Sequence, residues 1–216
     1  MKPKFCAITP TRGDRPKFDE HCKYLIKRQT LKPDHHFFID FPPLNDEPDL
    51  TKRVRIGVQI AKDMGFESAY IIENDDYYPD NYFASMQLDE FDFIGQPQTH
   101  YYHLKTRRFY TEYHKMRASL FTTGFKIAAI EGFYWPDDKT VMLDLKLWEI
   151  NCFQKFKTCI HSPLGIKHGI GLCGGSAHNE NFPYKYYDPD LAWLKRFVQD
   201  KYSLNFYKSL MKNGLK

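Results

Sequence analysis

Apolar residues in the first 90 positions alternate between short continuous runs and longer segments in which they recur at helical spacing. The runs at 5–9, 36–39 and 69–72 are short and bounded by polar or turn-forming residues, which predicts three buried strands. The segments at 18–29 and 51–64 predict helices, and a glycine follows the second. Because parallel strands need crossover connections, this order predicts an α/β fold with a parallel sheet and helices on its faces.

The second half of the chain is less regular. Its predicted elements are, in order, a strand at 91–95, a hairpin or excursion at 100–113, an apolar return at 120–130, a helix at 143–153 and a glycine-rich segment at 165–175. Near the C-terminal end, Asp188-Pro189 predicts the start of a further helix. The apolar face of that helix carries Trp193, Leu194, Phe197 and Val198.

Length and composition limit the class of protein. The 216 residues fit one compact domain, and 42% hydrophobic residues suffice for a sizeable core and exclude wholesale disorder. A net charge of +4 tolerates an acidic partner without requiring one. Apolar stretches fall well short of the roughly 20 residues that span a bilayer, and no signal-peptide pattern is visible. The five cysteines form no CxxC pair, so we expect a reduced, cytoplasmic location.

The carboxyl ends of the three predicted strands hold the candidate chemistry. Ligands bind at this edge of open α/β sheets, so Thr9, Asp40 and the acidic run Glu73-Asn74-Asp75-Asp76 are expected to form one site. Three carboxylates within four residues repel one another unless a cation is present, and hard oxygen ligands suit Mg²⁺ or Mn²⁺. We therefore expect a metal that bridges to a nucleoside diphosphate. The alternative is a solvated acidic turn.

Several motifs occur in a fixed order along the chain. They are Ile8 to Pro16, Gln29-Thr30, Asp40, Ile71 to Pro79, Arg117 to Leu120, Leu143 to Trp148 and the glycine segment that ends near His178. This set resembles glycosyltransferases of the GT-A type, most of all the small family-2-like enzymes of phages and bacteria, and covers most of the chain up to about residue 180.

The resemblance implies a single GT-A catalytic domain over 1–216, with 180–216 as a C-terminal helical extension. Its fold would be a Rossmann-like, mixed but mainly parallel sheet flanked by helices. Its activity would be metal-dependent sugar transfer from a nucleotide sugar, a UDP-sugar, to an acceptor hydroxyl. The location would be the host cytoplasm if the protein is phage-encoded.

The resemblance also implies roles for individual residues. Asp144 would be the general base of an inverting enzyme, although a carboxylate at a helix start would also be favoured by the helix dipole alone. Asp40 would contact the base, but Phe41-Pro42-Pro43 follows it where relatives often have a second Asp and a Gly. The remaining implied contacts are Thr9, Pro10, Thr11, Arg12, Arg53 and Asp75 for the donor, and Asp75, Asp76 and either His168 or His178 for Mn²⁺ or Mg²⁺.

Basic and aromatic residues interleave between His100 and Arg117. Arg and Lys neutralise phosphates while aromatic rings stack on bases, so DNA is a candidate acceptor, for example a hydroxymethylated base in phage DNA, and a glycan is the other. The candidate acceptor residues are Tyr102, Arg107, Arg108 and Arg117. Two alternatives stay open: a hairpin whose aromatics pack on the sheet, and a nucleic-acid-binding module whose carboxylates are structural or form a nuclease-like metal site.

Overall fold

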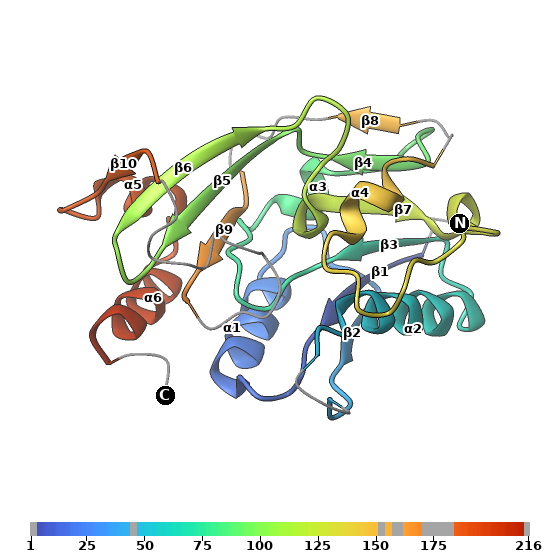
Figure 1. Ribbon diagram of the computed structural model, residues 1–216, viewed down its shortest axis with the longest axis horizontal. Helices are drawn as coiled ribbons and strands as arrows, with labels where there is room; N and C mark the ends of the chain where they lie inside the picture. Colours follow the sequence, from blue (N-terminus) through green and yellow to red (C-terminus); the bar gives the residue numbers. More distant parts are fainter. Residues whose placement is uncertain (1–3, 44–46, 151–153, 157–161, 170–183, 214–216) are drawn as a thin grey trace.

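The computed structural model describes residues 4–43, 47–150, 154–156, 162–169 and 184–213, and contains a large and a small sheet (Figure 1). The large sheet has the order β2-β1-β3-β7-β4-β8. Its strands are β1 (Phe5–Pro10), β2 (His35–Ile39), β3 (Ser68–Ile71), β4 (Phe93–Gly95), β7 (Thr123–Lys126) and β8 (Gln154–Phe156).

The strands of the large sheet are mostly parallel. β1 pairs in parallel with both β2 and β3, and β4 pairs in parallel with β8. Only β7 is reversed, because it lies antiparallel between β3 and β4. The predicted α/β class with a mixed, mainly parallel sheet is therefore confirmed, and the carboxyl ends of β1, β2 and β3 lie at one edge.

Helices cover both faces of this sheet, because successive side chains along β1 point to opposite faces and both sets are buried. Ala7 packs in one buried cluster with α1 (Pro16–Lys27), and Ile8 packs in another with α2 (Leu50–Asp63). Proline at the first position of α1 suits a helix start, because a backbone N–H at that position would have no partner within the helix. On α2, Gly57 permits the close approach to β1, because a Cβ there would lie 2.5 Å from Cγ2 of Ile8.

The small sheet has the order β10-β6-β5-β9 and lies on the left of Figure 1. The antiparallel pair β5 (Gln98–His103) and β6 (Arg108–Tyr113) confirms the predicted hairpin. The strand β9 (Leu164–Lys167) runs parallel to β5, and β10 (Tyr186–Tyr187) pairs with β6. The glycine-rich segment therefore begins as a strand at Gly165, while its residues 170–175 lie outside the described residues.

Six further helical elements complete the described chain. Five are short: α3 (Tyr82–Ser85), η1 (Leu120–Thr122), η2 (Ile127–Ile130), α4 (Leu143–Leu147) and α5 (Ala192–Phe197). The sixth, α6 (Lys201–Asn213), is similar in length to α1 and α2. None of the described helices is both long and apolar enough to cross a membrane.

Two predicted helices differ from the structure. The helix expected at 143–153 ends at Leu147, because the Trp148 indole turns into the core and its Nε1 donates to Thr123 Oγ1. Residues 151–153 lie outside the described part.

The C-terminal helix expected from Asp188-Pro189 begins later, at Ala192. Leu191 has a φ of 56°, which is incompatible with a right-handed helix, and the Asp188 carboxylate accepts the N–H groups of Trp193 and Leu194. Asp200 then caps a second helix, α6, by accepting from the N–H of Ser203.

Candidate functional site

The acidic run begins two residues after the end of β3, with Glu73 half-buried and the next three residues buried. Asn74 and Asp76 are each 1% exposed and Asp75 is 8% exposed, so the run is not a solvated turn. Carboxylate oxygens of Glu73, Asp75 and Asp76 lie within 4.8 Å of one another. The structure thus brings three acidic groups to the edge where parallel α/β sheets bind ligands.

The strand β9 holds this run in place. Tyr77 and Leu164 exchange two backbone hydrogen bonds of 3.0 and 2.9 Å, and the N–H of Ile166 donates to Asp76 Oδ1 at 2.7 Å. His168, directly after β9, therefore lies with its Nε2 2.7 Å from Asp75 Oδ2. The preceding residue, Lys167, is buried, and its positive charge acts on all three carboxylates.

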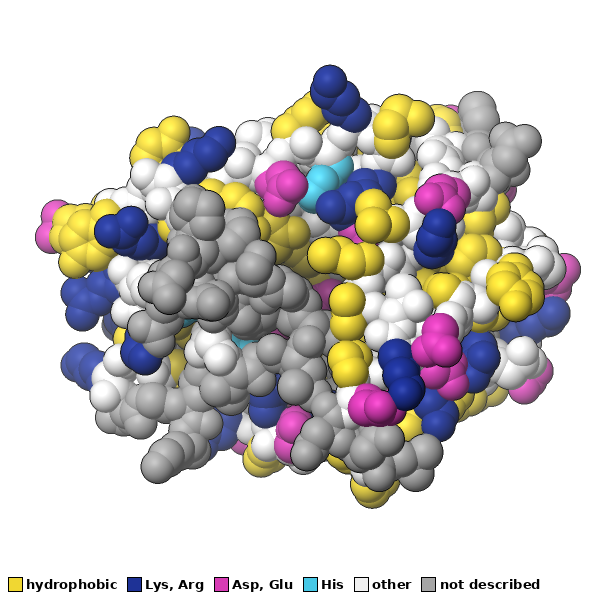
Figure 2. All heavy atoms as spheres, in the orientation of Figure 1, with side chains coloured by type: hydrophobic (Ala, Val, Ile, Leu, Met, Phe, Trp, Pro, Cys, Tyr) yellow, Lys and Arg dark blue, Asp and Glu magenta, His cyan; other side chains and the backbone are white. Residues whose placement is uncertain are grey.

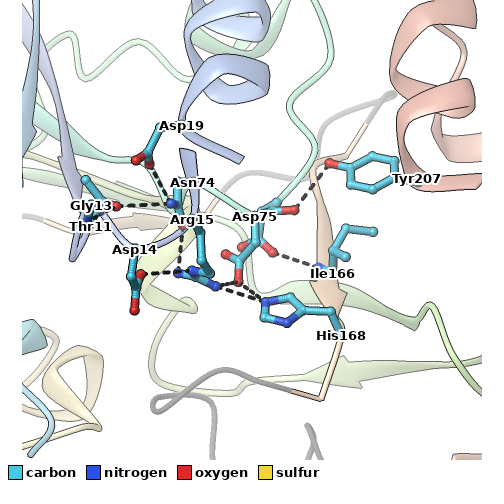
Figure 3. Close-up of polar contacts among 11 residues, drawn as sticks. Thr11, Gly13, Asp14, Arg15, Asp19, Asn74, Asp75, Ile166, His168 and Tyr207 are labelled. Carbon is cyan, nitrogen blue, oxygen red and sulfur yellow. Dashed lines mark hydrogen bonds and ion pairs between the residues drawn. The ribbon is translucent and has the colours of Figure 1, made fainter. Parts of the chain in front are cut away.

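The start of α1 contributes from the other side (Figure 3). Arg15 donates from Nη1 to Asp75 Oδ2 and from Nη2 to Asn74 Oδ1, both at 3.0 Å. Asn74 in turn donates to Asp19 Oδ1 at 2.7 Å and to Thr11 Oγ1 at 3.2 Å. The Asn74 side chain thereby ties the acidic run to the end of β1 and to α1.

The C-terminal helix α6 also contacts the acidic run. The hydroxyl of Tyr207 donates to the backbone carbonyl of Asp75 at 3.3 Å, and the Tyr207 side chain is fully buried. His21 on α1 binds Ser203 on α6 at 2.8 Å, so the two helices lie side by side. The site is therefore built from segments almost 200 residues apart.

Burial and neighbouring charges give the three carboxyl groups different pKa values. Burial raises the pKa of Asp76 well above its usual range, and the charges of Asp75 and Glu73 raise it further. Burial also raises the pKa of Glu73, to about 7. For Asp75 the effect of burial is outweighed by Arg15 and His168, which hold the pKa of that carboxyl well below its usual range.

The donor set fits a divalent cation. Asp76 Oδ2 is buried and has no hydrogen-bond partner among the residues that the structure describes. A buried carboxylate oxygen left without a partner is costly, and a cation would satisfy it. The carboxylates of Glu73, Asp75 and Asp76 are the hard oxygen ligands that suit Mn²⁺ and Mg²⁺, and the His168 imidazole lies beside Asp75.

The expected donor residues surround the ends of β1 and β2. Arg53 is 1% exposed and donates from Nη1 to the carbonyls of Thr11 at 2.7 Å and Ile39 at 2.9 Å. Phe41 covers the Arg53 guanidinium, with the ring centroid 4.0 Å from Cζ. Asp40 is exposed beside them.

The residues that follow β1 differ in accessibility. Thr9 is fully buried and its Oγ1 lies 2.8 Å from Nε2 of His36, and Pro10 and Thr11 are buried as well. Arg12 is half-buried and contacts the carbonyl of Glu47. Arg15 is thus the arginine of this turn that contacts the carboxylates.

Asp144 is buried within electrostatic range of Glu73. It is 7% exposed, its charge acts on Glu73, and Arg117 donates to its Oδ2. Burial raises the pKa of Asp144 although Arg117 lowers it, which suits a group that accepts a proton. A short helix, α4, positions this carboxylate.

The other candidate acceptor residues belong to the β5–β6 hairpin. Tyr102 is fully buried beneath the Trp193 ring, at a centroid distance of 5.9 Å, and Phe109 stacks on the same ring at 4.0 Å. Arg107 and Arg108 are exposed at the hairpin turn. On the face shown in Figure 2, Lys and Arg side chains lie at both ends of the molecule, and toward the right they alternate with Asp and Glu side chains.

Sequence reasoning missed several residues of the site. Arg15 and Asn74 lay inside motifs that were recognised, so their position beside a strand end was a usable signal. Tyr207 had no local signal, because its contact is made through the tertiary fold. His178, the other candidate metal ligand, lies outside the described residues.

Comparison with known proteins yields a likeness in fold. No protein-family model matches the sequence, and no curated protein matches it. A crystal structure of residues 1–349 of TarS from S. aureus is 11% identical with a TM-score of 0.49, covering 77% of this chain and 61% of that chain. A second TarS structure is 10% identical with a TM-score of 0.48, and the match covers 77% of this chain and 37% of that chain. The chain thus spans less than two thirds of either structure.

The raised pKa of Glu73 predicts how stability depends on pH. Without metal, the folded protein holds a proton on Glu73 more firmly than the unfolded chain does, so its contribution to the free energy of unfolding is lost as pH rises from 4.5 to about 7. We expect Glu73→Gln to stabilise the metal-free protein by roughly 1–3 kcal/mol at pH 8 and by much less at pH 5.

Urea unfolding in the presence of a chelator measures this difference. Glu20→Gln, at an exposed carboxylate on α1, is the matched control and should change stability equally at both pH values. A Glu73→Gln effect that is the same at pH 5 and pH 8 would contradict the assignment.

Proposed function

We propose that the protein is a GT-A-type glycosyltransferase that moves a sugar from a UDP-sugar to an acceptor hydroxyl with the help of Mn²⁺ or Mg²⁺. The observation that carries this proposal is the buried Asp76 Oδ2, which has no hydrogen-bond partner in the described chain and belongs to a cluster with Asp75 and Glu73. The ordered motifs that resemble this enzyme class support it independently.

Three side chains would hold the cation: Asp75, Asp76 and His168. When bound, the cation would neutralise charge that develops on the leaving diphosphate. Lys167, buried at the end of β9, would add positive charge on the same side. The uridine would lie toward β2, with Asp40 at the base and Arg53 bracing the strand ends through its bonds to Thr11 and Ile39.

Asp144 would act as the general base. In an inverting transfer, the acceptor oxygen forms a bond to the anomeric carbon as the bond from that carbon to the phosphate oxygen breaks. The electron pair of the broken bond leaves with the diphosphate, and the acceptor proton goes to the Asp144 carboxylate. The raised pKa of Asp144 and its closeness to Glu73 support this role, and Arg117 would fix the orientation of the carboxylate.

For the acceptor we propose DNA. Support comes from the turn between β5 and β6, where Arg107 and Arg108 are exposed and β10 adds two tyrosines that are 57% and 58% exposed, Tyr186 and Tyr187. Cations with accessible rings beside them suit a phosphate backbone with stacked bases. DNA binding without sugar transfer would instead favour a nucleic-acid-binding module.

Metal-dependent nucleotide binding is the first expected result. At 100 times its dissociation constant a ligand stabilises the folded state by about 2.7 kcal/mol, which is roughly 5–10 °C in melting temperature for a chain of this size. We expect UDP with Mn²⁺ to produce such a shift and Asp76→Asn to abolish it. Asp63→Asn, at the end of α2, should keep the shift. A full shift in Asp76→Asn would refute the metal assignment.

The role of Asp144 predicts a loss of rate without a loss of donor binding. We expect Asp144→Asn to lower kcat by about 10²–10⁴-fold, because an amide accepts no proton from the acceptor. The affinity for UDP and Mn²⁺, measured by calorimetry, should stay within a few-fold of wild type. Unchanged kcat would show that another group takes the proton.

The proposed DNA contact predicts a change in salt dependence. We expect replacement of both Arg107 and Arg108 by Gln to reduce the slope of log affinity against log salt by up to about 2. The double variant Arg55→Gln with Lys62→Gln removes the same charge from α2 and should leave the slope unchanged. Wild-type affinity that is independent of salt would exclude DNA as the partner.

A further inference from the structure

Arg15 sits at the point where the candidate metal ligands converge. Its Nη1 is 3.0 Å from Asp75 Oδ2 and also 3.0 Å from Nε2 of His168. Those two atoms are themselves only 2.7 Å apart (Figure 3). The guanidinium thus lies against the same oxygen and nitrogen that would contact a cation.

Whether or not Nε2 of His168 carries a proton, one of its two contacts, with Arg15 or with Asp75, is unfavourable. If Nε2 of His168 carries a proton, it donates to Asp75 and the proton faces an N–H of Arg15. If Nε2 carries none, it accepts from Arg15 and its lone pair faces the Asp75 oxygen at 2.7 Å. A small cation in contact with both atoms would remove the conflict, because both would then present lone pairs to it.

The side chain of Arg15 is only partly enclosed. It is 21% exposed and follows a turn in which Gly13 has a φ of +72°. Its second nitrogen is held by Asn74, whose oxygen does not belong to the proposed ligand set. The guanidinium can therefore leave Asp75 without losing all of its partners, and an anionic diphosphate would attract it.

We propose that Arg15 couples metal and nucleotide binding: it competes with the cation for Asp75 and His168 in the empty site and binds the nucleoside diphosphate once the cation has displaced it. This inference rests on the proposed function. It predicts opposite effects on the affinities of the two ligands. Removal of Arg15 should strengthen the binding of the metal alone and weaken the binding of the nucleotide.

Calorimetric titrations with MnCl₂ alone, UDP alone and MnCl₂ in the presence of UDP test the proposal on Arg15→Gln. We expect Mn²⁺ alone to bind at least 5-fold more tightly than to wild type, and UDP to bind more weakly. The factor by which UDP tightens Mn²⁺ binding should fall from about 5–150 toward 1. Arg55→Gln removes an equal charge from exposed α2 and should behave as wild type in all three titrations.

The outcomes separate this inference from the proposed function. Equal Mn²⁺ affinity in wild type and Arg15→Gln overturns the role of Arg15 but leaves the metal site in place. No Mn²⁺ binding by either protein overturns both. If Arg15→Gln does not fold, Arg15→Lys replaces it in the titrations. An ammonium has no planar fork to engage Asn74 and Asp75 together, so we expect affinities between those of wild type and Arg15→Gln. Wild-type affinities in Arg15→Lys would then overturn the proposal.

Discussion

Repulsion among three carboxylates at the end of a buried strand is the constraint on which the site depends. Two unit charges 4.8 Å apart repel by roughly 3–4 kcal/mol at an effective dielectric constant of about 20. That is a large part of the 5–15 kcal/mol that stabilises a typical domain. Glu73, Asp75 and Asp76 can lie together only where other groups compensate them.

The compensating groups come from two separate parts of the chain. Arg15 lies at the start of α1, and Lys167 and His168 lie at the end of β9. Tyr207 on α6 binds the Asp75 backbone carbonyl and so holds the acidic run in place without adding charge. The small sheet therefore has a direct role in the site, because β9 places a cation and an imidazole beside the acidic run. A site made in this way forms only when both sheets and the last helix have folded.

Local patterns predicted the parts of the fold that depend on local interactions. The strands β1, β2 and β3 and the helices α1 and α2 follow from apolar runs and helical spacing, and the parallel order follows from their alternation. The helix expected at 143–153 was too long, because the burial of Trp148 in the core, a tertiary contact, ends it early.

The residues of the site also fall into those with a local sequence signal and those whose contacts depend on the tertiary fold. Motifs in the sequence predict the acidic run and Asp144 as site residues, whereas the pairing of Asp144 with Arg117 and the contact of Tyr207 depend on segments that only the folded chain brings together. Tyr102 illustrates the opposite case. Its place in an alternating basic and aromatic stretch indicated a binding surface, yet the same alternation puts it on the face that Trp193 covers.

The geometry of the hairpin limits the size of an acceptor that uses the whole predicted surface. Arg108 and Tyr113 stand at opposite ends of β6, and five steps at about 3.4 Å per residue separate them by roughly 17 Å. Arg117 lies beyond Tyr113 in the chain and pairs with Asp144 near the carboxylates. A monosaccharide or a short lipid headgroup cannot reach from Asp144 to the hairpin turn. If the protein is the proposed transferase, an acceptor that contacts both would have to be an extended polymer such as a nucleic acid or a long glycan, and a small soluble acceptor would use the Asp144 end alone.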